Sequence, residues 1–272
     1  MERKIRKLQK ILERMGKIVV AFSGGIDSSV LLKIAADRLE GKNLLAVSAV
    51  SPIHPAWEKR EAVRIARLFK VKHLFIATEE LKDTKFISNA ANRCFYCKKE
   101  LFEKMEQIRQ KYGFNCIADG TNIDDFRDFR PGEQAKKMYG VCSPLKEAGL
   151  TKNEIRRYAK NIGLPFWDKP SMSCLSSRIP YGQKISLDRL KRIEKGESFL
   201  KSLGFRQVRI RDYGYLARIE VSEDKLKDAV KMKERISRKL KKTGYTYITL
   251  DLEGFRSGSM NKQLENMENN GR

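Results

Sequence analysis

The sequence lacks any apolar run close to the roughly 20 residues that a membrane-spanning helix requires. Residues 1–15 alternate Lys and Arg with Leu and Ile, so they lack the apolar core of a signal peptide. The five cysteines are odd in number, which argues against a disulfide framework and favours reduced thiols, metal ligands or catalytic sulfur. We therefore expect a cytoplasmic protein with no membrane partner.

The composition is that of a globular chain: of 272 residues, 41% are hydrophobic and 33% are charged. Lys and Arg number 57 against 34 Asp and Glu, which gives a net charge of +23. This excess favours a polyanionic ligand, nucleic acid or an anionic membrane surface. A solvated basic face on helices such as 225–242, or adaptation to heat, explains it equally well.

Strand and helix patterns alternate through the first part of the chain. Short β-branched or apolar runs predict buried parallel strands at 17–22, 44–50, 73–77 and 115–118. Helical periods predict helices at 1–15, 28–39, 56–69 and 98–112. Thr151 and Glu154 predict a capping box for a further helix. This alternation predicts an α/β fold with a doubly wound parallel sheet.

The pattern changes at residues 166–183, where prolines and serines follow no helical or strand period. We interpret this segment as a long functional loop and a domain boundary. Beyond it, a helix at 187–203, strands at 206–211, 215–221 and 245–252, and a basic helix capped by Ser222 predict a second, smaller α+β domain. The predicted domains are therefore 1–180 and 181–272.

The segment Ser23-Gly-Gly-Ile-Asp-Ser-Ser29 lies between the first predicted strand and helix, where backbone N–H groups and the helix dipole favour an anion. Gly24 and Gly25 let the backbone approach phosphate, and Asp27 is a candidate to hold Mg²⁺. Hydroxyl donors come from Ser23, Ser28 and Ser29. No Gly-x-x-x-x-Gly-Lys pattern is present, so this is not a Walker loop.

This segment resembles the SGGxDS signature of the PP-loop ATP pyrophosphatases, which cleave ATP between the α and β phosphates and transfer AMP to a substrate oxygen. The resemblance implies ATP binding here, with Ala21 and Ser23 near the nucleotide and Asp27 towards Mg²⁺. Asp119 and Thr121 follow the fourth predicted strand, and ligands bind at the carboxyl ends of parallel strands. Their loop resembles the adenylate-binding loop of that class, although Asp124 would serve equally as a helix N-cap.

Cys94 and Cys97 form a C-x2-C pair, and Cys174 lies in the irregular loop. A C-x2-C pair alone is consistent with zinc, redox chemistry or an iron–sulfur site. Three thiolates can hold a four-iron cluster and leave one iron open for an extra sulfide, and Arg93 and Lys98 favour thiolates. Three unrelated thiols are the alternative.

Seven segments together resemble the LarE family, the ATP-dependent sulfur transferases of nickel-pincer cofactor synthesis: 23–29, 92–98, 119–125, 170–182, 208–211, 217–221 and 254–260. In that family ATP adenylates a carboxylate of pyridinium-3,5-biscarboxylic acid mononucleotide, and sulfur displaces AMP to give a thiocarboxylate. The resemblance implies an AMP-forming enzyme that uses ATP and Mg²⁺, and a second domain for substrate binding or oligomerisation. It also implies sulfide or another sulfur donor.

Family members with one active-site cysteine sacrifice its sulfur, whereas members with three resemble cluster-dependent enzymes. Cys174 matches the sacrificial position, and Cys94 and Cys97 are also present. The resemblance therefore implies a [4Fe-4S] cluster held by all three cysteines, with Cys174 and Asp27 in catalytic roles.

Substrate binding requires sites for a phosphate and a carboxylate. Arg209 and Arg211 alternate on a predicted strand, so they project to one face and are candidates to grip the mononucleotide phosphate. The polar face of a half-buried strand is the alternative. Ser177 and Arg178, near Cys174, are candidates for contacts with the phosphate and the reacting carboxylate.

A tRNA thiolating enzyme is the main competing function, since some also join a PP-loop domain to a three-cysteine cluster and the positive charge suits RNA. An evident RNA-binding module is lacking. An amidating PP-loop enzyme and a non-enzymatic ATP-binding module are further alternatives. The resemblance also suggests an acidic or metal-contact role for Glu197 and Asp228, but solvated helix positions are the expectation. Cys116 is expected to pack in a strand, and the two histidines are expected to be structural.

Overall fold

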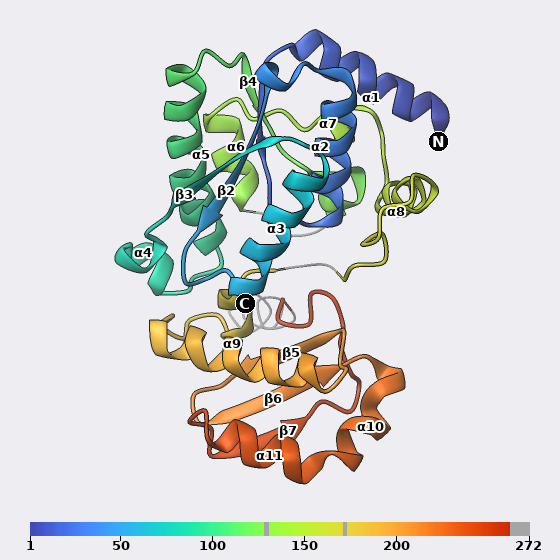
Figure 1. Ribbon diagram of the computed structural model, residues 1–272. Helices are drawn as coiled ribbons and strands as arrows, with labels where there is room; N and C mark the ends of the chain where they lie inside the picture. The colour runs from blue at the N-terminus through green and yellow to red at the C-terminus, as the bar shows by residue number, and fades with distance from the viewer. Residues whose placement is uncertain (128–130, 171–172, 262–272) are drawn as a thin grey trace, which may run out of the picture. The chain divides into compact units, whose positions relative to one another are not determined.

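Residues 1–127, 131–170 and 173–261 are described by a computed structural model (Figure 1). The chain divides into two compact units. The first unit comprises Met1–Glu80 and Cys94–Met172, and the second comprises Leu81–Arg93 and Ser173–Arg272. The second unit therefore includes Leu81–Arg93, a segment from the first half of the chain. The predicted division at residue 180 placed this segment in the first domain.

A parallel sheet in the order β3-β2-β1-β4 forms the centre of the first unit. Its strands are β1 (Ile18–Ala21), β2 (Leu44–Val50), β3 (Lys72–Ala77) and β4 (Cys116–Ala118). The chain runs from β1 through β2 to β3 on one side and later adds β4 on the other. The strand order thus reverses at β1, and the loops after β1 and β4 follow the carboxyl ends on the two sides of that switch point, where such sheets bind ligands.

Helices cover both faces of this sheet. One face carries α1 (Glu2–Met15), α2 (Ile26–Arg38), α3 (Ala56–Leu68), α7 (Pro144–Glu147) and α8 (Lys152–Asn161). The other face carries α5 (Arg93–Lys111) and α6 (Gly132–Met138). Along β1, Ile18 and Val20 pack into the first layer and Val19 into the second, as strand alternation requires. The predicted doubly wound α/β fold is confirmed.

Two helices of the first unit can be compared with their predicted starts. The capping box of α8 is present, because the Thr151 hydroxyl accepts from the Glu154 N–H and the Glu154 carboxylate accepts in return. Helix α5 begins at Arg93, five residues before the predicted start, so Cys94 and Cys97 lie on its first turns. The remaining short helical segments are the 3₁₀ turns Gly41–Asn43, Glu80–Lys82 and Ile123–Arg127.

The second unit is a three-stranded sheet in the order β5-β6-β7, with an antiparallel and a parallel pair. Its strands are β5 (Val208–Asp212), β6 (Leu216–Val221) and β7 (Tyr247–Leu250). Its helical elements are α4 (Thr84–Ile87), η4 (Leu175–Arg178), α9 (Leu187–Ser202), η5 (Glu223–Lys225), α10 (Leu226–Lys231) and α11 (Lys233–Lys241). Apolar side chains of α9, α10 and α11 pack with those of the strands in one core.

The predicted basic helix of this unit is two helices, α10 and α11, which meet at Met232. Ser222 precedes the short turn η5 and makes no side-chain capping bond there, so its predicted capping role is wrong. The basic side chains of these helices stay near the surface while Ile236 and Leu240 are buried. The amphipathic pattern was therefore correct and only the continuity of the helix was not.

Asn89 fastens the segment Leu81–Arg93 to the rest of the second unit. Its side chain is fully buried and its backbone adopts a φ of 59°, a left-handed conformation that is uncommon outside glycine. Its Nδ2 donates to the carbonyl oxygens of Ile179 (3.3 Å), Pro180 (2.7 Å) and Gln183 (3.0 Å). Its Oδ1 accepts from Arg93 Nη1 at 2.6 Å.

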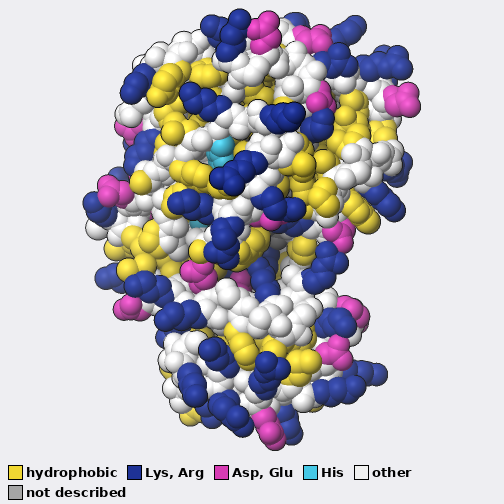
Figure 2. All heavy atoms as spheres, viewed as in Figure 1, with side chains coloured by type: hydrophobic (Ala, Val, Ile, Leu, Met, Phe, Trp, Pro, Cys, Tyr) yellow, Lys and Arg dark blue, Asp and Glu magenta, His cyan; other side chains and the backbone are white. Residues whose placement is uncertain are grey.

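Within the described ranges, no helix combines the length and the apolar character needed to cross a membrane. Figure 2 shows Lys and Arg side chains spread over the visible surface of each unit, among acidic and hydrophobic ones. The positive charge is not gathered into one continuous patch on this face.

Candidate active site

The phosphate-binding candidate, residues 23–29, joins β1 to α2. Gly24 has a φ of 69°, and a Cβ there would lie 3.3 Å from the backbone of α3, so both the backbone conformation and the close contact disfavour a larger residue. Ser23 Oγ accepts from Gly25 N at 3.2 Å and lies 3.1 Å from Ser28 Oγ. Ser29 is fully buried, and its Oγ has no hydrogen-bond partner among the described residues. The loop is ordered by its own hydroxyls and retains one unused donor.

Asp27 lies on the first turn of α2 and forms an ion pair with Lys152 of α8. Its Oδ1 is buried and accepts no hydrogen bond within the part of the chain that the structure describes. Burial raises the pKa of the Asp27 carboxyl, and the Lys152 ammonium only partly opposes this shift. Buried carboxyl groups with a perturbed pKa are characteristic of functional sites.

Gly120 brings the second loop against the first. A Cβ on Gly120 would lie 2.8 Å from Ser28 N and 2.9 Å from Ser28 Cα, so only glycine permits this approach. Ala21, the last residue of β1, lies at the same edge of the sheet. The loops after β1 and β4 therefore meet at the start of α2, as the sequence predicts.

Asp119 is the centre of a buried polar cluster. Its Oδ2 accepts from Thr121 Oγ1 at 2.7 Å and lies 3.1 Å from Lys136 Nζ, while its Oδ1 accepts from Ser143 Oγ at 2.7 Å. Burial alone would raise the pKa of Asp119, but Lys98 and Lys136 outweigh burial and hold this pKa below its ordinary value. Asp119 thus remains charged and fixes the hydroxyl of Thr121.

Three lysines that are not among the predicted site residues contact these loops: Lys136, Lys152 and Lys169. Lys136 is 5% exposed and donates to Thr121 Oγ1 at 3.0 Å. Lys169 donates to Gly24 O at 3.0 Å, and burial lowers its pKa. Each is one of many lysines in a basic chain, so no local pattern marks them, and only the tertiary contacts reveal them.

Cys94 and Cys97 lie three residues apart on α5, a spacing that places both side chains on one helical face. Cys94 is exposed and Cys97 is partly buried. Cys97 Sγ donates to Glu80 Oε1 at 3.7 Å, and Thr78 Oγ1 donates to the same oxygen at 2.9 Å. Two neighbouring thiols are a donor set suited to iron or zinc.

Cys94 and Cys97 belong to the first unit, and Cys174 belongs to the second. No group of three His, Cys, Asp or Glu side chains with a metal-binding arrangement occurs among the residues that the structure describes. The cluster ligands therefore remain a prediction.

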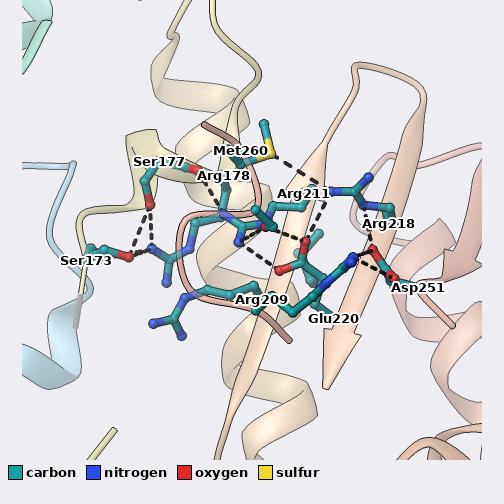
Figure 3. A network of polar contacts seen from close by, with 12 residues as sticks. Ser173, Ser177, Arg178, Arg209, Arg211, Arg218, Glu220, Asp251 and Met260 are labelled. Carbon is teal, nitrogen blue, oxygen red and sulfur yellow. Dashed lines mark hydrogen bonds and ion pairs between the residues drawn. The ribbon is translucent and has the colours of Figure 1, made fainter. Parts of the chain in front are cut away.

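Arg178 organises the loop around Cys174 (Figure 3). Its Nη1 donates to Ser173 O at 2.7 Å and to Cys174 O at 2.9 Å, and Ser177 Oγ donates to Cys174 O at 2.8 Å. The opposite edge of the guanidinium pairs with Glu197, through Nε at 2.9 Å and Nη2 at 3.0 Å. Arg178 thus ties the cysteine loop to helix α9.

Glu197 was expected to be solvated, and this expectation is wrong. The residue is 3% exposed, because the face of α9 that carries it packs against β5 and η4. Burial alone would raise the pKa of Glu197, but the guanidinium of Arg178, with Arg209 and the Ile210 N–H, holds this pKa below its ordinary value. Asp228, by contrast, lies at the surface and pairs with Lys225 at 3.0 Å, as expected.

Arg209 and Arg211 are buried on β5, and their guanidinium groups gather with that of Arg178 near β6 (Figure 3). Arg211 Nη2 pairs with Glu220 at 2.7 Å, while its Nε has no hydrogen-bond partner within the described ranges. Arg209 lies over the ring of Phe255, and burial lowers its pKa to about 10. The unit thus concentrates three guanidinium groups beside the cysteine loop.

The remaining cysteines have surroundings that favour inert thiols. Burial, with Cys142 as a neighbour, raises the pKa of Cys116 to about 12. Burial also raises the pKa of Cys142. His73 Nε2 contacts Ser48 Oγ at 2.8 Å and its ring packs on Phe75, consistent with the structural role expected of it.

Comparison with known proteins identifies the family. No protein-family model matches the chain. A pyridinium-3,5-bisthiocarboxylic acid mononucleotide synthase of Lactiplantibacillus plantarum is 36% identical over 253 residues, which are 93% of this chain and 92% of that protein. The chain belongs to the LarE family. Another relative, an uncharacterised protein of Synechocystis, is 38% identical over 97% of this chain and 99% of its own length.

More distant relatives place the LarE family among the PP-loop enzymes. An argininosuccinate synthase of Pyrococcus furiosus is 28% identical over 56% of this chain and 40% of its own length. A probable tRNA sulfurtransferase of Methanobrevibacter smithii is 26% identical over 56% of this chain and 42% of its own length. The predicted family, the α/β fold and the prediction of an enzyme are thereby confirmed.

Proposed function

We propose that this LarE-family chain is an ATP-dependent sulfur transferase of nickel-pincer cofactor synthesis. It would adenylate the carboxylates of pyridinium-3,5-biscarboxylic acid mononucleotide and convert them to thiocarboxylates. The observation that carries this proposal is the 36% identity to a synthase of the bisthiocarboxylate, which extends over 93% of the chain and so includes both units.

The first unit would bind ATP with Mg²⁺. The unused hydroxyl of Ser29 and the N–H groups at the start of α2 suit a polyphosphate, and Asp27 has an oxygen available for a cation. Thr121, fixed by Asp119, would contact the adenylate portion. The contact of Gly120 with Ser28 supports this arrangement, because it brings both loops to one end of α2.

Adenylation makes AMP the leaving group, so that sulfur can replace a carboxylate oxygen. We propose that Cys94, Cys97 and Cys174 hold a [4Fe-4S] cluster, which would supply a transferable sulfide. The chain's own contribution is to orient the cysteine loop, since Arg178 donates to the backbone carbonyl oxygens of both Ser173 and Cys174.

The second unit would recognise the mononucleotide. Arg209 and Arg211 offer positive charge in a buried setting, and the Nε of Arg211 retains a donor. Ser177 Oγ lies beside this group, 2.9 Å from Arg178 Nη1. A phosphate is the ligand that such a cluster of guanidinium groups suits best.

The test uses protein prepared without oxygen, with iron and sulfide quantified. It is incubated with ATP, Mg²⁺, a sulfide source and the biscarboxylate mononucleotide, and oxygen-to-sulfur exchange is followed by mass spectrometry. We expect exchange with release of AMP and pyrophosphate. Cys174→Ala should abolish exchange and Cys94→Ala should lose the cluster, whereas the matched control Cys142→Ala should retain both.

A full cluster in Cys94→Ala would overturn the proposed ligand set. Iron-loaded protein that leaves the mononucleotide unchanged but thiolates tRNA would favour the competing function, to which the similarity with a tRNA sulfurtransferase points. A complex with tRNA would also weaken steeply as salt is raised.

A further inference from the structure

Lys152 is held beside the phosphate loop by a rigid support. It is the first residue of α8, whose N-terminus is fixed by the Thr151–Glu154 capping box. Helix α8 packs on α2 through the buried side chains of Ile155 and Ala159. The backbone N–H of Lys152 also donates to Asp124 Oδ2 at 2.7 Å. These contacts fix the backbone of Lys152, so that its ammonium group lies beside the first turn of α2.

The ammonium group meets one oxygen of Asp27 and leaves the other, Oδ1, buried without a hydrogen-bond partner among the described residues. The ammonium group of Lys152 therefore pairs with only one of the two carboxylate oxygens of Asp27. A divalent cation can bind a carboxylate through both oxygens. A cation bound at Oδ1 would lie close to the ammonium group on the other oxygen, and the repulsion between the two charges would weaken the hold of Asp27 on Lys152. The side chain of Lys152 is 27% exposed, so it has room to move.

We propose that Lys152 is an internal cation that occupies the Mg²⁺ position on Asp27 and moves to the polyphosphate when Mg–ATP binds. This inference rests on the proposed use of ATP. A lysine ammonium is a compact charge on a flexible stem, which suits a change of partner from carboxylate to phosphate. The exchange keeps one cation on Asp27 in both states.

In its second position Lys152 would stabilise the leaving group. During adenylation the substrate carboxylate oxygen forms a bond to the α-phosphorus, and the bond from that phosphorus to the α–β bridging oxygen breaks. The electron pair passes to pyrophosphate, whose added negative charge lies where a lysine beside the loop can meet it. Lys169 has a different task, because its ammonium binds the carbonyl of Gly24.

The test compares Lys152→Gln with Arg157→Gln, which removes the same charge from an exposed position of the same helix. Binding of inorganic pyrophosphate without Mg²⁺, and the Mg²⁺ concentration required for half-maximal ATP binding, are measured by calorimetry. Lys152→Gln should weaken pyrophosphate binding about tenfold and lower the Mg²⁺ requirement, because Asp27 becomes free for the metal. Lys152→Arg should retain pyrophosphate binding within about threefold, and Arg157→Gln should change neither quantity.

Asp27→Asn should change pyrophosphate binding in the opposite direction to Lys152→Gln. Without Mg²⁺ it should bind pyrophosphate more tightly than the wild type, because Lys152 no longer has a carboxylate partner. Pyrophosphate binding by Lys152→Gln equal to that of Arg157→Gln would overturn this inference alone. Wild-type protein that binds neither ATP nor pyrophosphate would overturn the proposed function as well.

Discussion

The buried ion pair between Arg178 and Glu197 allows a quantitative prediction. Replacing Glu197 by alanine leaves the Arg178 guanidinium, 3% exposed, without its carboxylate, and leaves the Ile210 N–H without the acceptor that it meets at 3.0 Å. Removing one partner of a buried pair costs about 3–5 kcal/mol. Glu197→Gln should cost less, because the amide oxygen still accepts from the Ile210 N–H.

These values translate into a large thermal shift. For a unit of roughly one hundred residues, each kcal/mol lowers the midpoint by about 4 °C, so Glu197→Ala should unfold the second unit about 12–20 °C earlier. Calorimetry that resolves the two units measures this directly. Asp228→Ala, which removes a surface carboxylate with a partner at 3.0 Å, is the control and should shift the midpoint by about 2 °C or less.

The same pair predicts a dependence on pH. Because the pKa of Glu197 is lowered in the folded protein, its stabilising contribution is present above the ordinary carboxyl pKa and is lost as pH falls through the lowered value. The difference between wild type and Glu197→Gln should therefore narrow in acid. A loss below about 1 kcal/mol for Glu197→Ala, or a difference that is constant with pH, would refute the reasoning.

Substitutions at four other positions test the structure. Asp212→Ala, which strips a fully buried carboxylate from two arginines and a tyrosine, should cost about 3–5 kcal/mol in urea unfolding, and a cost below 1 would contradict this. Asn89→Ala should cost about 1 kcal/mol more than Asn89→Gly, since glycine adopts the left-handed backbone of this position without the steric cost that alanine has; equal losses would argue against strain there. Lys136→Met should raise the pKa of Asp119, so that ATP binding is lost at a higher pH on acidification. An unchanged pH dependence would show that Lys136 does not control the charge of Asp119 during ATP binding. Asp27→Asn should raise the melting temperature at neutral pH, because burial raises the pKa of the Asp27 carboxyl and its ionisation therefore disfavours folding; a lower melting temperature would contradict this prediction.

Local patterns predicted the sheet of the first unit well. The run 44–50 is β2 residue for residue, and the segment 23–29 joins β1 to α2 as expected. Buried parallel strands are short and apolar, and glycines mark the loops that follow β1 and β4. The prediction missed the start of α5, because the helix begins at Arg93, five residues before the helical period of 98–112.

Partners from distant segments explain the other differences. Glu197 appears on a helix rich in charged residues, and only the position of Arg178 in an irregular loop makes its burial favourable. The alternation of Arg209 and Arg211 was visible in the sequence, but their burial depends in part on Glu220 of the neighbouring strand. Ion pairs between distant segments depend on the topology of the fold, so the sequence around either partner does not predict them.

The discontinuous make-up of the second unit has a consequence for synthesis of the chain. Asn89 and Phe86 leave the ribosome long before the carbonyls near residue 180 that receive the Asn89 amide. At ordinary translation rates this delay is on the order of 5–20 s, during which Leu81–Arg93 has none of its later partners. The nascent first unit must therefore carry an unsatisfied internal segment until the C-terminal half emerges. No single truncation removes the second unit, because cutting after residue 172 leaves Leu81–Arg93 behind, without the carbonyl oxygens of Ile179, Pro180 and Gln183 that accept from Asn89 Nδ2.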